Sequence, residues 1–337
     1  MLAAGVLGTG SYLPEEIITN QDLERIVDTS DAWIRERTGI RERRRAAERE
    51  ATSDLCLEAA RRALADAGVP AEEIDLIMVA TVTPDMAFPA TGCLVQDQLG
   101  AARAWAFDLE AGCSGFLYGL ALGSQLIATG YSRYILLIGA ETFSRIINWT
   151  DRNTCVLFGD GAGAVVMGPV PQGRGVLASR MAADGSGGKL LFQPAGGSRL
   201  PASEETVKER LHTIHMRGPE VFRFAVRCME EVSLDVLHRC GLEPQDLDLF
   251  VPHQANWRII DATRRRLGLP EDKVVVNLDR YGNMSSASIP VALDEARQQG
   301  RLREGDLVLL ASFGAGFTWG AALLRWGRGQ QAGNLLA

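Results

Sequence analysis

The sequence predicts an α/β protein built from two related halves. Its 337 residues are 46% hydrophobic, which is ample for a large core, and at about 150 residues per domain the length suggests two domain-sized units. The segment AGVPAEEIDLIMVAT from Ala67 is similar to CGLEPQDLDLFVPHQ from Cys240, 173 positions further on. Each segment follows an amphipathic helical stretch and runs into a short apolar strand, so the pair indicates one α/β unit that occurs twice.

The composition excludes several classes of protein. The formal net charge is −7, whereas a nucleic-acid binder needs a basic face or stripe. Six cysteines are too few for a secreted domain held together by disulfides. No apolar run reaches the roughly 18 residues of a membrane span, and the N-terminus lacks the basic region of a signal peptide. We therefore expect a cytoplasmic protein that binds neither nucleic acid nor membrane.

The expected helices and strands follow the same order in each half. Helices are expected over residues 54–67 and 221–240, and each ends where a repeated segment begins. The strands over residues 135–138 and 307–310 are apolar along their whole length. Such strands are typical of sheets that helices cover on both faces, so a layered architecture follows.

A second correspondence places a strand, a turn and the start of a helix in each half. The strings are AWAFDLEAGCSG and KVVVNLDRYGNMSS, and aligning their turns puts Asn283 at the position of Cys113, 170 residues later. The helices that follow are expected to end at Gly130 and Gly300, again 170 apart. This alignment predicts that the two turns lie at equivalent places.

The boundary between the halves is expected at the linker-like string GPVPQGRG. It divides the chain into residues 1–172 and residues 173–337. Residues 185–215 are rich in Gly, Ser, Lys and Glu and interrupt the pattern of the second half. Long loops in compact domains are often lids or binding loops, so we expect a surface excursion there.

Cys113 is the best candidate for a nucleophile. It lies between glycines, directly after a predicted strand and at the start of a predicted helix. A helix N-terminus favours thiolate over thiol, and small neighbours let a carbonyl approach. The other cysteines are interpreted as packing residues, as most buried cysteines are; they are Cys56, Cys93, Cys155, Cys228 and Cys240.

His253 and Asn283 are the candidate partners of Cys113. His253 ends the strand LDLFVP and opens the turn HQAN, and strand ends are where α/β sheets place ligand-contacting groups. If the halves pack about a pseudo-twofold axis, the turn of Asn283 converges on the turn of Cys113. A hydrogen-bonded structural histidine and a helix N-cap are the ordinary alternatives for these two residues.

Five strings together resemble the β-ketoacyl-acyl-carrier-protein synthase III family of the thiolase superfamily. They are TSDAWIRERTGIRERR, AGCSGFLYGL, HQANWRII, GNMSSASIP and SFGAGFTWG, in that order between about residue 3 and residue 327. The resemblance implies a thiolase-like fold, with two pseudo-duplicated α/β halves packed in layers around a shared site. It also implies decarboxylative condensation of an acyl-CoA primer with malonyl-acyl carrier protein, which initiates fatty-acid synthesis.

The resemblance implies a Cys113, His253 and Asn283 triad. Cys113 would carry the acyl group, and His253 and Asn283 would hold the thioester oxygen of the malonyl enolate. The backbone N–H groups of Cys113 and Ala315 would form the oxyanion hole. Ala315 stands where some relatives have glycine, which leaves the donor in place if its φ suits an L-residue.

Other positions are assigned by the same resemblance. Trp33, Arg37 and Arg152 would bind the nucleotide end of CoA, Arg258 would face the acidic carrier protein, and Phe88 would reach across a dimer interface and limit primer length. The remaining positions expected to bind CoA or substrate are Thr29, Met216, Gly218, Asn256 and Phe313. The resemblance implies a homodimer, and it implies no metal or redox cofactor.

Some alternative functions would use the same candidate residues, whereas others would need a motif that the sequence lacks. A starter-unit ketosynthase or an acyltransferase of polyketide or secondary metabolism would use the same fold, although an enzyme that only moves acyl groups has less need of Asn283. An HMG-CoA-synthase-like enzyme would need a catalytic glutamate, and Glu110 has the wrong spacing from Cys113. A dinucleotide-dependent oxidoreductase would need the motif G-x-G-x-x-G directly after a strand, and the sequence has no such motif. A non-catalytic paralogue would have lost a triad member, and none is lost.

Overall fold

The first half of the chain forms a five-stranded sheet. The structure, a computed structural model, describes residues 3–327. The strand order is β1-β7-β6-β4-β5. β6 is parallel to β4 and β4 to β5, whereas β1 and β7 run antiparallel to their neighbours. The strands are β1 (Ala3–Tyr12), β4 (Leu76–Ala80), β5 (Trp105–Leu109), β6 (Ile135–Glu141) and β7 (Gly161–Val170).

The second half forms a four-stranded sheet with the corresponding order, β8-β13-β12-β11. β11 and β12 are parallel, and β13 is antiparallel to both β12 and β8. The strands are β8 (Gly175–Ala183), β11 (Leu249–Pro252), β12 (Leu307–Gly314) and β13 (Thr318–Arg325). β8 therefore corresponds to β1, β13 to β7, β12 to β6 and β11 to β4, which is the pseudo-duplication that the sequence predicts.

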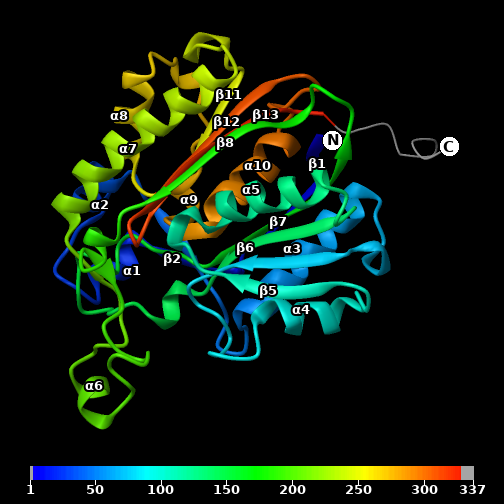
Figure 1. Cartoon of the computed structure of the whole chain (residues 1–337). Coiled ribbons are helices and arrows are strands. Elements are labelled where there is room, and N and C mark those ends of the chain that lie inside the picture. The colour runs from blue at the N-terminus through cyan, green and yellow to red at the C-terminus, as the bar shows by residue number, and fades with distance from the viewer. Residues whose placement is uncertain (1–2, 328–337) are drawn as a thin grey trace.

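Helices form three layers around the two sheets (Figure 1). α5 (Gly115–Ala128) and α10 (Ser288–Gln298) lie between the sheets, which is why α5 is apolar over most of its surface. α3 (Thr52–Ala67) and α4 (Thr91–Leu99) cover the outer face of the first sheet. α7 (Gly218–Arg239) packs on the outer face of the second sheet, and α8 (Trp257–Arg266) packs against α7.

Smaller elements complete the chain. β2 (Glu16–Thr19) and β3 (Glu42–Arg45) form a two-stranded sheet. Between these strands in the sequence are α1 (Asn20–Glu24) and α2 (Asp31–Thr38). α9 (Leu278–Tyr281) precedes α10. Among the described residues, no helix is both long and apolar enough to cross a membrane.

The excursion over residues 185–215 is confirmed as a segment outside the layers. It holds β9 (Leu191–Phe192) and α6 (Glu204–Lys208) and ends in β10 (His215–Met216), which pairs with β9. In Figure 1 the turn around α6 projects away from the body of the molecule.

The predicted strand after Lys273 is wrong. Only a single bridge joins Val274 to Phe250 of β11. The Gln254 side chain donates to the Val275 carbonyl and accepts from the Asn277 backbone N–H, so side-chain bonds replace the ladder that β5 forms in the first half. The four-stranded second sheet lacks its fifth strand for this reason.

The predicted equivalence of Asn283 with Cys113 is also wrong. A 3-10 turn over Gly112–Ser114 leads into α5, and a 3-10 turn over Ser285–Ala287 leads into α10. Both turns begin at a residue with positive φ, +52° at Gly112 and +45° at Ser285. The offset is therefore 173, as in the strands, and Ser286 is the counterpart of Cys113. The offset of 170 between Gly130 and Gly300 arises because α10 is three residues shorter than α5.

Candidate active site

Cys113 lies where β5 gives way to α5. Gly112 needs its positive φ of 52° to turn the chain there, and a Cβ on Gly112 would lie 2.9 Å from the Ala315 backbone nitrogen. The Ser312 hydroxyl of β12 donates to the Cys113 carbonyl at 2.8 Å. A Cβ on Gly314 would lie 2.5 Å from the Cys113 nitrogen. The second sheet thus ends directly against Cys113, so both halves of the chain contribute to this place.

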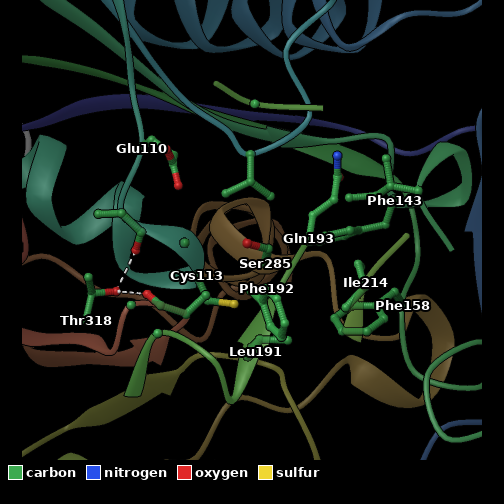
Figure 2. Close-up of a pocket in the computed structure, with 18 of the residues that line it drawn as sticks. Glu110, Cys113, Phe143, Phe158, Leu191, Phe192, Gln193, Ile214, Ser285 and Thr318 are labelled. Carbon is green, nitrogen blue, oxygen red and sulfur yellow. Dashed lines mark hydrogen bonds between the residues drawn. The ribbon is translucent and has the colours of Figure 1, made fainter. Parts of the chain in front are cut away.

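A cavity of about 640 Å³ opens beside Cys113. Figure 2 shows Cys113 and Ser285 on its wall, with Phe143, Phe158 and Ile214 among the apolar residues around it. The excursion supplies much of this wall: Gly188, Leu191, Phe192, Gln193, Ala195, Gly196, Gly197 and Ile214. The excursion was expected as a surface loop, and its side chains enclose the space next to the thiol. Its sequence carries no motif from which these wall residues could be identified.

The Cys113 thiol is protonated in the free chain. Burial, with a smaller contribution from the nearby Glu141, raises the pKa of Cys113 to about 11, although the Ser285 hydroxyl and the backbone N–H groups of Cys113 and Ala315 lower it. The donors at the helix start thus lower the thiol pKa in the expected direction, but the loss of solvation outweighs them. Those two N–H groups face the sulfur, and such a pair can stabilise an oxyanion formed on a carbonyl bound there.

Ala315 has no backbone strain. Among the non-glycine residues that the structure describes, only Arg210 and Ser285 have positive φ. The Thr318 hydroxyl, within hydrogen-bond distance of both the Ala111 and the Ala315 carbonyl (2.7 and 3.0 Å), ties this turn to the start of the Cys113 turn. The alanine that departs from the glycine of some relatives is thus compatible with an N–H donor at this position.

His253 is a buried, neutral imidazole. It follows β11, only 2% of its surface is exposed, and its backbone N–H donates to the Ala311 carbonyl of β12 at 2.8 Å. Burial lowers the pKa of His253 to about 3, and its Nδ1 has no hydrogen-bond partner among the described residues. Ala311 precedes Ser312, whose hydroxyl donates to the Cys113 carbonyl, so β12 holds the backbone of both residues. A neutral imidazole in this position donates a hydrogen bond without carrying charge.

Asn283 is held so that its amide nitrogen is left to donate. Its backbone N–H donates to the Leu157 carbonyl at 2.8 Å, and its carbonyl accepts from Gly159 at 3.0 Å. The side-chain oxygen accepts from the Ser285 backbone N–H at 2.8 Å. Because the oxygen is occupied, the NH2 group is the part of the amide that remains to bind another acceptor.

Trp33, Arg37 and Arg152 come together at the surface. The Arg37 and Arg152 guanidinium carbons lie 4.8 Å and 5.2 Å from the centre of the Trp33 ring. Arg152 also donates to the Asp28 carbonyl at 2.8 Å. Thr29, in the same loop, has a buried hydroxyl without a partner among the described residues. Two cations around one indole suit a nucleotide with phosphate groups.

Asn256 and Arg258 join α8 to the end of α2. The Asn256 side chain caps α8 by accepting from the Arg258 backbone N–H at 2.8 Å, and it donates to the Arg37 carbonyl at 3.1 Å. The exposed Arg258 donates from Nε to the Glu36 carbonyl at 3.1 Å. These bonds place Arg258 at the outer surface beside the Trp33 cluster.

The other residues singled out by resemblance lie apart from the cavity wall. Phe313 is buried in an aromatic group with Phe224 and Phe317, in the hydrophobic cluster against which Trp33 and Met216 pack. Gly218 begins α7 directly after β10. Phe88 is 84% exposed, so it is not an ordinary core aromatic.

The remaining cysteines are free thiols of mixed environment. Cys56, Cys155 and Cys228 are buried and Cys240 is partly buried, as a packing role predicts. Cys93 is exposed on α4, so the packing interpretation is wrong for it. Its sulfur lies 3.7 Å from the Ala106 carbonyl of β5, the edge strand of the first sheet.

Two polar residues near Cys113 were not found from the sequence. Ser285 lines the cavity, and Glu141 is fully buried at the end of β6. A signal for Glu141 exists in the string YILLIGAE, where a carboxylate ends an apolar strand. Nothing in the string GNMSSASIP distinguishes Ser285 from its neighbours.

Comparisons with known proteins agree along nearly the whole chain. The family described as 3-oxoacyl-[acyl-carrier-protein (ACP)] synthase III matches residues 107–185, and its C-terminal counterpart matches residues 237–326. The chain is 60% identical over 327 residues to the beta-ketoacyl-[acyl-carrier-protein] synthase III of Caldanaerobacter subterraneus subsp. tengcongensis, covering 97% of this chain and 99% of that protein.

Solved structures give the same result. The corresponding synthase III of Thermus thermophilus is similar with a TM-score of 0.90 and 51% identity, over 96% of this chain and 99% of that one. The priming β-ketosynthase of the R1128 polyketide pathway is similar with a TM-score of 0.89 and 37% identity, over 96% of each chain.

Proposed function

The chain belongs to the 3-oxoacyl-[acyl-carrier-protein] synthase III family, and from that premise we propose which of its residues carry out the reaction. It is an acyltransferase that condenses an acyl-CoA primer with malonyl-acyl carrier protein, and the family needs no metal or redox cofactor. The observation that carries the residue assignment is the Cys113 thiol at the cavity wall, faced by the N–H groups of Cys113 and Ala315.

The first half-reaction transfers the acyl group to Cys113. The sulfur attacks the thioester carbonyl of acyl-CoA, and the oxyanion that forms is held by the Cys113 and Ala315 N–H groups. Collapse of the tetrahedral intermediate releases CoA and leaves acyl-Cys113. The apolar cavity wall of Phe143, Phe158 and Ile214 receives the acyl chain.

The second half-reaction forms the carbon–carbon bond. Malonyl thioester loses CO2, and the resulting enolate oxygen accepts hydrogen bonds from the neutral His253 and from the Asn283 amide. The orientation of the Asn283 amide, with its oxygen occupied by the Ser285 N–H, supports this role. The enolate carbon then attacks acyl-Cys113 and yields a 3-oxoacyl thioester on the carrier protein.

The surface cluster receives the CoA nucleotide. Trp33 stacks on the adenine, while Arg37 and Arg152 attract the phosphates. Thr29, Asn256, Met216, Gly218 and Phe313 form the remaining contacts of CoA and the pantetheine arm. Arg258, exposed beside this cluster, faces the acidic carrier protein when it delivers malonyl thioester.

The exposed edge of the first sheet supports a homodimer. β5 is the edge strand, and apolar side chains remain exposed around it, including Trp105 at 43%, Phe88 at 84% and Tyr131 at 72%. A bare strand edge beside apolar side chains is typical of an interface between copies. In the dimer, Phe88 would reach the acyl cavity of the partner subunit. A multi-angle light-scattering mass of one chain at micromolar concentration would refute the dimer.

Two further assignments rest on the same premise. The domain boundary is placed between residues 172 and 173, in the turn between β7 and β8. The cytoplasm is proposed as the compartment because the nucleophile must remain a reduced thiol, as the six free cysteines suit.

A second candidate function is a priming ketosynthase of polyketide synthesis. The structural similarity to the R1128 enzyme supports it, although the higher identity to curated synthase III relatives favours fatty-acid initiation. The two functions are distinguished by whether a bacterium grows after its own synthase III gene is replaced by the gene of this protein.

The proposed acyl-enzyme is tested by intact-protein mass. Acetyl-, isobutyryl- and octanoyl-CoA are offered separately, and the mass of one acyl group is expected on the parent and none on Cys113→Ser. The primers that react also report the primer range. Acylation of Cys113→Ser to the parental extent would refute the assignment of the nucleophile.

A further inference from the structure

Glu141 is a buried carboxylate for which the mechanism above has no use. It lies at the end of β6 with no exposed surface. Its oxygens accept from the Thr83 hydroxyl at 2.7 Å, and from the Val82 N–H and the Thr81 hydroxyl at 3.2 Å each. The Ser286 hydroxyl, 3.2 Å away, donates to the Ala80 carbonyl at 2.6 Å. No lysine or arginine in the described part of the chain forms an ion pair with it. Burial raises the pKa of Glu141 to about 7, and these donors keep it from rising further.

Ser285 connects this carboxylate with the nucleophile. It is 1% exposed, it lines the cavity of Cys113, and Figure 2 shows both side chains in that space. Its hydroxyl has no hydrogen-bond partner of ordinary length and angle among the described residues. The hydroxyl is nevertheless close enough to lower the pKa of both the Cys113 thiol and the Glu141 carboxylate. An uncommitted buried hydroxyl close to a thiol and a carboxylate can bridge them.

Acylation needs such a bridge because the Cys113 proton has no other evident acceptor. The thiol pKa of about 11 keeps the sulfur protonated at neutral pH. His253, with a pKa of about 3, is a poor base. A carboxylate with a pKa near the working pH is the better matched proton acceptor.

We propose that the Ser285 hydroxyl passes the Cys113 proton to Glu141 during acylation and returns it when condensation frees the sulfur. This inference rests on the proposed acyl-Cys113 intermediate. Ser285 lies beside Cys113 in the cavity wall, whereas Glu141 acts through Ser285 and stores the proton.

The bonds and protons balance over the two half-reactions. In acylation the Sγ–H bond breaks, Ser285 Oγ takes that proton, and the former Ser285 proton moves to Glu141. The bond from Sγ to the acyl carbon forms, and CoA leaves as a thiolate that takes a proton from water. In condensation the new carbon–carbon bond forms, CO2 leaves, and the acyl–Sγ bond breaks. The Cys113 thiolate then recovers its proton from Ser285, which recovers one from Glu141.

The test is the rate of acylation by acetyl-CoA as a function of pH, measured in single turnovers by quenched intact-protein mass. In the parent, the rate constant should fall about tenfold per pH unit below pH 7, as Glu141 becomes protonated. Glu141→Gln and Ser285→Ala should each lower the plateau by about 100-fold and abolish this dependence.

A matched control changes the same carboxylate from outside the cavity. Thr83→Val removes the hydroxyl that donates to Glu141 at 2.7 Å, so the fall in rate should begin at a higher pH. The thiols of Cys113, before α5, and Cys56, on α3, interact electrostatically with Glu141, and the Asp85 and Asp108 carboxyls interact with the same Cys56 thiol. Burial raises the pKa of both thiols, so neither accounts for a transition near pH 7.

The outcomes are distinct. Parental rates and pH dependence in both Glu141→Gln and Ser285→Ala would overturn the proton relay while leaving acyl-Cys113 intact. An unshifted transition in Thr83→Val would overturn Glu141 as its source. If Glu141→Gln does not fold, Ser285→Ala decides alone, because it leaves the carboxylate in place. Absence of acylation in the parent would instead refute the proposed function.

Discussion

Replacing Glu141 by glutamine is expected to stabilise the fold, and to do so more as the pH rises. In the unfolded chain the carboxyl ionises near its ordinary value of 4.5, whereas in the folded chain burial raises the pKa to about 7. Glu141 therefore does not lower the free energy of unfolding below pH 4.5. It lowers it increasingly between pH 4.5 and pH 7, and by the full amount above pH 7. At 1.36 kcal/mol per pKa unit, the full amount is about 3 kcal/mol.

The magnitude translates into a measurable melting difference. At pH 5 Glu141 lowers the free energy of unfolding by about 1 kcal/mol. The gain in free energy of unfolding of Glu141→Gln over the parent should therefore grow by about 2 kcal/mol between pH 5 and pH 8. For a chain of this length that growth corresponds to about 3 °C in the melting temperature. Glutamine has nearly the same volume, and its oxygen still accepts from the Val82 N–H and the Thr83 hydroxyl, so little packing is lost.

Differential scanning calorimetry at pH 5, 6, 7 and 8 provides the measurement. The exposed Glu72→Gln is the matched control, since it removes one carboxylate without altering the interior. A melting difference between parent and Glu141→Gln that stays constant over this pH range, or one that shrinks as the pH rises, would refute the reasoning about burial.

The other predictions concern the reaction and the assembly. His253→Ala and Asn283→Ala should each keep acylation by acyl-CoA within a few-fold of the parent and slow decarboxylation of malonyl-acyl carrier protein by about 100-fold, because each removes one donor to the enolate; loss of acylation would contradict this. Gly112→Ala should cost at least about 1–2 kcal/mol through its left-handed backbone, and thermal unfolding would show it. Trp33→Ala should raise the KM for acyl-CoA with kcat nearly unchanged, since stacking on CoA is remote from the chemistry. Trp105→Glu at the exposed sheet edge should shift the light-scattering mass from two chains to one, and an unchanged mass would count against that interface.

The layers of the fold could be predicted because they depend on local patterns. Wholly apolar strands such as β6 and β12, and the repeat at an offset of 173, indicate two helix-covered sheets without knowledge of any contact. The strand expected after Lys273 failed because a side chain, Gln254, took the place of the neighbouring backbone in the hydrogen bonding. Such a replacement depends on residues that are distant in sequence.

The position of Cys113 at the start of a helix could be predicted from the sequence, but its ionisation could not. Cys113 has the sequence signature of a helix start, whereas its pKa depends on how completely the rest of the chain covers it. The same limit applies to Ser285 and Glu141, which lie more than 140 positions apart in the sequence and come together only because the 3-10 turn over Ser285–Ala287 packs against β6. The cavity wall supplied by residues 185–215 depends on tertiary packing in the same way.

The most direct test of the central claim is a chase of isolated acyl-enzyme. The parent is acylated with acetyl-CoA, freed of CoA on a desalting column, and mixed with malonyl-acyl carrier protein alone. The account predicts that Cys113 loses its acyl group, that the carrier protein gains the 3-oxoacyl group in equal amount, and that CO2 is released. Retention of the acyl group on the enzyme while product forms would contradict an acyl-Cys113 intermediate.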